Sequence, residues 1–161
     1  MPPFYDNVDT RLIKSPKVYV ADSGLACHLL GMDSARDVAR SPFLGPLFEG
    51  FIDAEIVKAQ INSARRPEIY YFRDEHGLEV EFLVPGRRGG ISLVERKAAR
   101  TATPTMAWPM QRLGNALKKK RLQGGVIEMS LVHQLSSTAT TTTAIMPGVQ
   151  AVSWPSVIQT L

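Results

Sequence analysis

Two hydrophobic patterns follow one another in the middle of the chain. Between Leu47 and Asn62, apolar residues recur at the three- and four-residue spacing of one helix face. From Glu68 to Lys97 they alternate with polar residues, which is typical of half-buried strands. Turn signals at DEHG (74–77) and PGRRGG (85–90) divide this second region into EIYYFRD, LEVEFLV and ISLVERK. The pattern therefore predicts one helix followed by an antiparallel meander of three strands.

Shorter signals precede this region. The β-branched and aromatic run KVYVA at 17–21 predicts a strand. Asp22 or Ser23 is placed to cap a helix that continues to Leu30, because short polar side chains accept the first free backbone N–H groups of a helix. Gly31 is a natural stop for that helix, since glycine tolerates the left-handed conformation that ends many helices.

The part of the chain after the meander predicts one further helix and two strands. The helix spans 109–122 and is basic toward its C-terminal end, as the helix dipole favours. The strands are GVIEMSLV (125–132) and GVQAVSW (148–154), and the terminal residues 155–161 predict a turn of helix. The Ser/Thr-rich segment 137–144 predicts a mobile loop. A meander followed by a helical crossover predicts an α/β fold with a mixed sheet and helices packed on it.

Composition changes this picture little. The chain has 161 residues, of which 44% are apolar and 21% charged, which is enough for a domain with its own core. No apolar run approaches the roughly 18 residues of a membrane span, and no signal peptide is visible, so we expect a cytoplasmic protein without a membrane partner. The single cysteine, Cys27, has no cysteine partner and is expected to be a buried apolar residue. The net charge of +4 permits contact with nucleic acid without requiring it.

The second and third strands carry a set of residues with possible chemistry. Side chains two apart on a strand share a face, so Glu79 and Glu81 are expected on one face of their strand, and Glu95 and Lys97 likewise share a face of the next strand. If the strands pair around the turn at 85–90, three carboxylates and one lysine gather at one end of the ribbon. Hard divalent cations such as Mg²⁺ prefer carboxylate and water oxygens. The alternative is that two amphipathic strands simply expose their polar sides to solvent.

These segments also resemble a known group. GPLFEGFIDAEI, YYFRDEHGLEVEFLV and LVERKAAR resemble the PD-(D/E)XK nuclease-like superfamily. Within it they are most similar to the C-terminal domain of unknown function of bacterial and archaeal AAA-type ATP-binding proteins. Its pattern is Gly-x-x-Phe-Glu, Tyr-x-x-Arg, Glu-Val-Asp-Phe and Glu-x-Lys. KSPKVYVADSGLACHLLG (14–31) and the end of the chain are similar too, so the resemblance covers most of 11–161.

The resemblance implies a restriction-endonuclease-like αβββαβ core, with a mixed sheet flanked by helices. It divides the chain into a joining segment of strand and helix at 1–40 and a nuclease-like domain at 41–161. Because no Gly-x-x-x-x-Gly-Lys-Ser/Thr phosphate loop occurs, this chain carries no such ATPase site of its own. The resemblance then implies a fragment that lacks an upstream ATPase domain, and that domain of the longer parent chain is an expected partner.

Individual roles follow from the resemblance alone. Glu81 and Glu95 match metal-binding carboxylates, Glu49 matches the helix glutamate that supports the metal, and the expected ion is Mg²⁺ or Mn²⁺. Lys97 matches the lysine that activates the attacking water, so the implied catalytic set is Lys97, Glu95 and Glu81. Glu81 stands where the group has aspartate, and the extra methylene moves its carboxylate by about 1 Å, a shift that can cost about a hundredfold in rate. Arg96 stands where an apolar residue is usual, on a face expected to pack under a helix.

Two functions follow. The first is divalent-metal-dependent hydrolysis of DNA or RNA phosphodiesters, with basic segments steering the nucleic-acid backbone. The alternative is a catalytically inactive regulatory or docking domain of the ATPase, which the departures at Glu81 and Arg96 favour. The basic segments are Arg65–Arg66, Arg87–Arg88, Arg96–Arg100 and Lys118–Arg121.

Glu55 lies almost centrally on the apolar stripe of the predicted helix at 47–62. A buried carboxylate needs a partner. It is expected either to form a structural ion pair with Arg73 or Lys97, or to reach the candidate site itself.

The remaining candidate residues have more ordinary interpretations. The histidines do not have metal-ligand spacing, so each is expected in a turn or at the surface. The two tryptophans are expected in the core or in a docking surface rather than as platforms for stacking bases. These residues are His28, His76, His133, Trp108 and Trp154.

Overall fold

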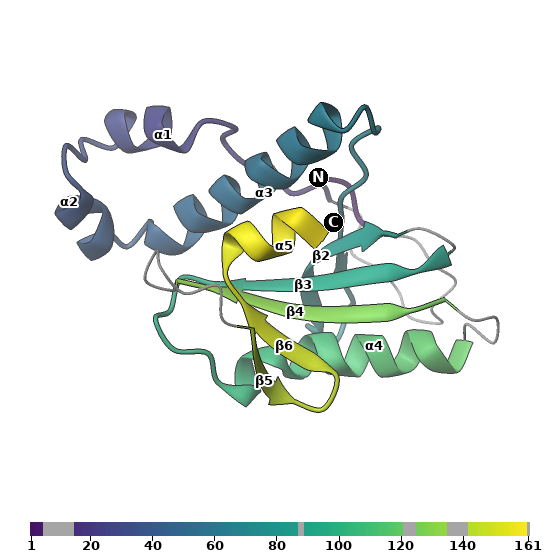
Figure 1. The fold of residues 1–161 in the computed structure, drawn as a ribbon. Helices are drawn as coiled ribbons and strands as arrows, with labels where there is room; N and C mark the ends of the chain where they lie inside the picture. The colour runs from purple at the N-terminus through teal and green to yellow at the C-terminus, as the bar shows by residue number, and fades with distance from the viewer. Residues whose placement is uncertain (5–14, 87–88, 121–124, 135–141, 161) are drawn as a thin grey trace. The chain divides into compact units, whose positions relative to one another are not determined.

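The computed structural model describes residues 1–4, 15–86, 89–120, 125–134 and 142–160. It divides the chain into two compact units, which are described separately (Figure 1). One contains Met1–Lys17 and Glu68–Leu161, and the other contains Val18–Pro67. The predicted boundary at residue 40 lies at the end of a short helix inside the second unit.

The larger unit is built on a six-stranded mixed sheet with the order β1-β2-β3-β4-β6-β5. The first three strands pair antiparallel, as the meander predicts, and β4 joins β3 in parallel. β6 is parallel to β4, and β5 is antiparallel to β6 at the edge. The predicted α/β class with a mixed sheet is therefore confirmed. The strands are β1 (Tyr70–Arg73), β2 (Glu79–Pro85), β3 (Ile91–Lys97), β4 (Ile127–His133), β5 (Thr143–Met146) and β6 (Val149–Val152).

Helices lie on both faces of this sheet. In Figure 1, α4 (Trp108–Lys120) runs along one face and α5 (Trp154–Thr160) lies on the opposite face. A short 3₁₀ helix at Pro104–Ala107 leads into α4. The predicted helix at 109–122 is thus confirmed as far as residue 120, because 121–122 lie outside the described residues.

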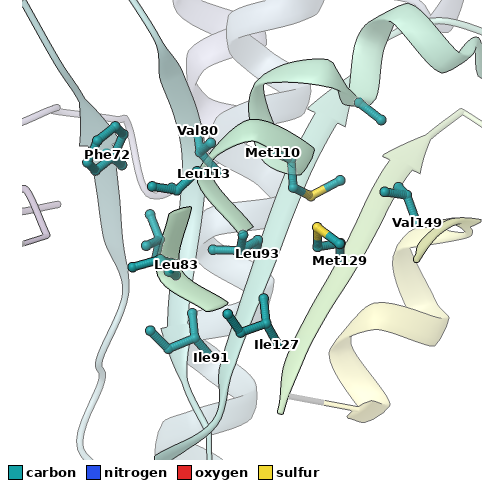
Figure 2. Close-up of a cluster of buried hydrophobic side chains, with 12 residues drawn as sticks. Phe72, Val80, Leu83, Ile91, Leu93, Met110, Leu113, Ile127, Met129 and Val149 are labelled. Carbon is teal, nitrogen blue, oxygen red and sulfur yellow. The ribbon is translucent and has the colours of Figure 1, made fainter. Parts of the chain in front are cut away.

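The main core fills the space between α4 and the sheet. Figure 2 shows Met110 and Leu113 of α4 among side chains from β2, β3 and β4. Gly114 permits this close approach, since a Cβ added there would lie 2.7 Å from the Met129 sulfur. The core side chains are Phe72, Val80, Leu83, Ile91, Leu93, Ala107, Met110, Leu113, Leu117, Ile127, Met129 and Val149.

β2 contains a bulge that the alternating pattern does not reveal. Its partners on β1 are Leu83 opposite Tyr70 and Val80 opposite Phe72, so β2 advances by three residues while β1 advances by two. The extra residue allows Val80 and Leu83 to enter the same core, although regular alternation would place them on opposite faces. The shared face predicted for Glu79 and Glu81 rests on regular alternation, and that alternation is interrupted at Glu81.

The smaller unit is helical. Its helices are α1 (Ser23–Leu29), α2 (Ala35–Arg40) and α3 (Leu44–Asn62). Asp22 caps α1 by accepting the Leu25 N–H at 2.9 Å, and Gly31 adopts a φ of 70° after it, as predicted. The long predicted helix is confirmed but begins at Leu44 rather than Leu47.

Three local predictions were wrong. Residues 17–21 form no strand, and Val18 and Val20 are exposed. Cys27 is half-buried rather than buried. The predicted loop at 137–144 contains the first residues of β5, and its residues 137–141 lie outside the described residues, as does the basic pair Arg87–Arg88.

Among the helices that the structure describes, none has both the length and the apolar character that a membrane span requires.

Candidate functional site

The candidate site lies where β2 and β3 stop pairing regularly. The last regular pair toward this end is Phe82 opposite Val94. The next residues, Glu81 of the bulge and Glu95 of β3, therefore come alongside each other. Both carboxylates are buried, with side chains that are 11% and 4% exposed. As the sequence predicts, the structure brings the side chains of Glu81, Glu95 and Lys97 together.

Glu81 is held by donors on both carboxylate oxygens. The backbone N–H of Arg96 donates to Oε2 at 3.0 Å, and the Arg96 Nε donates to the same oxygen at 3.2 Å. Lys97 Nζ donates to Oε1 at 3.2 Å. Hydrogen bonds between charged groups are about twice as strong as neutral ones, so these three donors fix the orientation of Glu81.

Lys97 joins the two carboxylates. Besides its bond to Glu81, its Nζ donates to Glu95 Oε1 at 2.7 Å. The lysine side chain is 36% exposed, so it also connects the buried pair with solvent. Glu95 Oε2 is buried and has no hydrogen-bond partner among the described residues. Buried polar atoms without a hydrogen-bond partner are uncommon in folded proteins, so this oxygen requires a physical explanation.

The electrostatics of this cluster shift two pKa values. Burial, followed by the nearby Glu81 carboxylate, raises the pKa of Glu95 from 4.5 to about 7, although Lys97 and a hydrogen bond from the Glu81 backbone oppose this rise. For Lys97, burial lowers the pKa, but attraction to Glu95 and Glu81 outweighs it, and the net direction is upward. Lys97 is therefore charged at neutral pH, whereas a lysine that removes a proton from water needs a lowered pKa.

Arg96 is the principal residue that the sequence did not single out as part of the site. Its side chain is fully buried, and its guanidinium carbon lies 3.7 Å from the centroid of the Phe82 ring. The expected packing of this position under a helix did not suggest an ion pair with Glu81. The arginine at position 96 could itself have indicated the ion pair, because an arginine buried on a strand requires a carboxylate partner.

Glu79 does not join this cluster. It pairs instead with Arg73 at 3.6 Å and with Lys17. The expected gathering of three carboxylates is therefore wrong in this respect. The structure brings together two carboxylates and two cations, with Glu79 in a separate and more exposed set.

Two further glutamates belong to the other unit. Glu49 lies on α3, and its predicted approach to the metal site stays a prediction. Glu55 forms an ion pair with Lys58 on the same helix. The expected structural ion pair thus exists, but its partner is neither Arg73 nor Lys97.

His133 was predicted at a turn or surface and is buried instead. It is the last residue of β4, in parallel register with Lys97. Its Nδ1 is buried without a hydrogen-bond partner among the described residues. The strand register, which the sequence does not give, places it beside the cluster. His28 and His76 are exposed as predicted, while Trp108 is 57% exposed and so is not a core residue.

Comparison with known proteins places the chain in a family. Residues 44–145, more than half of the chain, match the family described as Domain of unknown function (DUF4143). The chain belongs to this family. Residues 1–36 match a second description, Domain of unknown function (DUF8612).

Curated relatives of this DUF4143 protein include uncharacterized proteins of Mycobacterium tuberculosis and Mycobacterium bovis. Each is 33% identical over 112 residues, a stretch that covers 68% of this chain and 23% of the relative. The chain thus matches less than a quarter of the length of these relatives. No solved structure matches it.

The residues of this DUF4143 site do not fit a hard divalent cation in their present arrangement. The unpartnered Oε2 of Glu95 is the kind of oxygen that Mg²⁺ binds. However, both oxygens of Glu81 already accept from Arg96 and Lys97. No group of three or more histidine, cysteine, aspartate or glutamate side chains suited to a metal occurs in the described part of the chain. A further cation about 5 Å from the guanidinium would be repelled by about 3 kcal/mol per unit charge at an effective dielectric constant of about 20.

Proposed function

We propose that this chain is the nuclease-like module of an AAA-type ATP-binding protein, and that it acts as a docking or regulatory domain without nuclease activity. The observation that carries the second part is the ion-paired state of Glu81, whose oxygens are bonded to Arg96 and Lys97. The element order, helix α3, three antiparallel strands, helix α4 and a parallel strand, supports a PD-(D/E)XK-like core. The Glu-x-Lys sequence at Glu95–Lys97 resembles the motif that such a core would use for its chemistry.

The charge state of the cluster also supports a loss of catalysis. Metal-assisted hydrolysis requires carboxylate oxygens that are open to the ion. In this chain, Glu95 Oε1 and both oxygens of Glu81 are engaged. Lys97 is held charged by the same carboxylates, so it cannot act as the base that activates water at neutral pH.

The helical unit carries a surface that suits docking. Val18 is 87% exposed and Leu29 is 74% exposed. Only Ala26 of α1 is buried, and α2 has no buried residue. Helices this short are not stable without tertiary packing, and contiguous exposed apolar surface marks interaction sites. We call the exposed apolar residues that share one hollow the apolar face; it consists of Val18, Val20, Leu30 and Phe43.

A hollow in the apolar face indicates the kind of partner. It has a volume of about 220 Å³ and is lined by Val18, Ala26, Leu30, Phe43 and Leu47, among others. This lining would accept an apolar side chain from another protein segment. Because the matched stretch is 23% of the curated relatives, most of such a protein lies outside this chain. We therefore propose that the occupant is the remainder of the longer polypeptide, its ATPase domain.

A binding experiment tests this docking role. The probe is the part of the M. tuberculosis relative that lies outside the matched stretch, with the relative's own matched stretch as positive control. This chain should bind the probe in isothermal titration, and Leu30→Asp together with Phe43→Asp, two changes in the lining of the hollow, should weaken binding at least tenfold. Val126→Asp, a change at an exposed valine of the other unit, is the matched control and should leave binding unchanged.

Binding by the positive control but not by this chain would overturn the docking role for this chain. Equal weakening by Val126→Asp would show that added negative charge, rather than the apolar face, determines the result.

The second candidate function is metal-dependent cleavage of nucleic acid, which the unpartnered Oε2 of Glu95 favours. Supercoiled and branched DNA with Mg²⁺ or Mn²⁺ would be incubated with the wild-type chain and with Glu95→Gln and Lys97→Ala. Under the docking proposal, the wild-type chain cleaves no faster than the variants. Cleavage by the wild-type chain that both substitutions abolish would replace that proposal with the nuclease.

A further inference from the structure

We infer that the Arg96 guanidinium is a built-in cation that takes the place of a divalent metal beside Glu81, and so leaves the Glu81 carboxylate without a need for metal. This inference rests on the proposed nuclease-like core, because that core is the reason to expect a metal there.

The position of Arg96 supports this role in three ways. Its side chain is fully buried, so its charge acts at short range and with little screening. Its Nε and its backbone N–H converge on one oxygen, Glu81 Oε2. Its guanidinium lies over the Phe82 ring, which holds it in place. The guanidinium is therefore positioned against the carboxylate rather than extended toward solvent.

Charge balance shows what this cation replaces. Glu81 and Glu95 carry up to two negative charges, and Lys97 alone cannot neutralise both. Arg96 adds a second positive charge next to the Glu81 carboxylate. With an apolar residue at position 96, Glu81 Oε2 would keep only the backbone N–H, and two buried carboxylates would share one lysine. Glu81 Oε2 and Glu95 Oε2 would then be available to a cation.

The longer side chain of Glu81 fits the same interpretation. The resemblance predicts aspartate at this position, and the extra methylene extends the carboxylate. Its two oxygens contact the cations of Arg96 and Lys97 on β3. The departures at Glu81 and Arg96 thus belong to one interaction, in which each provides the partner of the other.

A metal titration tests the inference without any activity assay. Mn²⁺ binding would be measured from the electron paramagnetic resonance signal of the free ion and by isothermal titration. Arg96→Leu should bind Mn²⁺ at least tenfold more tightly than the wild-type chain. Arg96→Lys keeps a cation and should resemble the wild-type chain, while Glu95→Gln added to Arg96→Leu should abolish the gained binding.

The folding of each variant must be checked by circular dichroism, because removal of Arg96 unbalances buried charge. If Arg96→Leu does not fold, Arg96→Gln keeps a hydrogen-bond donor without the charge, and the same gain in Mn²⁺ binding is expected. The inference is overturned if the wild-type chain binds Mn²⁺ as tightly as the folded variant, or if the folded variant gains less than tenfold. A variant that gains no binding leaves the docking role intact, since that role is read from partner binding and DNA cleavage.

Discussion

Glu79 and Glu81 lie two residues apart on β2, yet they belong to different electrostatic regions. Glu79 is about one-third exposed and pairs with the side chains of Arg73 and Lys17 at the edge of the sheet. Glu81 is buried in the bulge, where Arg96 and Lys97 contact it. The same residue type therefore forms a surface ion pair in one place and part of a buried network in the other.

The difference shows how one extra residue changes the chemistry of a strand. Without the bulge, the side chains of Glu79 and Glu81 would lie on the same face of the sheet and share one environment. With it, Glu81 is re-aimed toward β3, as bulges commonly do for side chains near functional sites. The energetic consequences should differ accordingly, because solvent screens the first set and not the second.

The largest contrast is expected for the arginine partners of the two glutamates. Arg96→Leu leaves Glu81 buried with Lys97 as its only cation, and breaking a buried pair from one side costs about 3–5 kcal/mol. Arg73→Leu removes a half-exposed partner of Glu79 and should cost less than about 1 kcal/mol. Urea denaturation at neutral pH and constant salt measures both.

A rescue variant identifies the cause of that loss. Glu81→Met combined with Arg96→Leu removes both buried charges and should recover at least half of the stability lost in Arg96→Leu, since apolar replacement of a buried pair is often neutral. If the double variant is less stable than Arg96→Leu alone, the loss comes from packing around Phe82 rather than from the unpaired carboxylate.

A smaller effect is expected from pH, and it separates the buried site from the exposed one. Below pH 4.5 the Glu95 carboxyl is protonated in both the folded and the unfolded chain. Between pH 4.5 and about 7 the unfolded chain releases this proton while the folded chain retains it. The contribution of Glu95 to the free energy of unfolding therefore decreases as pH rises through this window, by about 3 kcal/mol in total.

Glu95→Gln provides the comparison, because its amide does not titrate. The difference in stability between Glu95→Gln and the wild-type chain should shift in favour of the variant as pH rises from 4.5 to 7. Denaturation at several pH values in one buffer series measures it. A difference that is constant across this window would mean that Glu95 ionises in the folded chain as it does in the unfolded chain.

The same strands show how much of the structure could be predicted from the sequence. The helical and the alternating hydrophobic patterns predict α3 and the strands β1, β2 and β3. An element that buries one face repeats its apolar residues at the period of a helix or a strand. Glu81, Glu95 and Lys97 were selected from their spacing and a family resemblance, and the structure brings them together. Neither step required knowledge of the sheet order.

The bulge in β2 and the partners of Arg96 could not be predicted from the sequence. An inserted residue leaves Glu-Val-Glu-Phe looking like ordinary alternation, although Val80 and Leu83 share one core. His133 became a neighbour of Lys97 only through the parallel register of β3 and β4. The strand expected at 17–21 failed because β-propensity reflects packing against neighbouring strands, and Val18 and Val20 remain exposed.

The smallest effect is expected at Glu79, and it completes the comparison. Glu79→Gln removes a carboxylate that is partly exposed and pairs with Arg73 and Lys17. Such pairs contribute about 0–1 kcal/mol and weaken as salt screens them. The variant should lose less than about 1 kcal/mol at low salt and less still in 1 M NaCl, as measured by urea denaturation. A loss that is as large as that of Arg96→Leu and insensitive to salt would mean that Glu79 belongs to the buried network, and that the bulge does not separate the two glutamates.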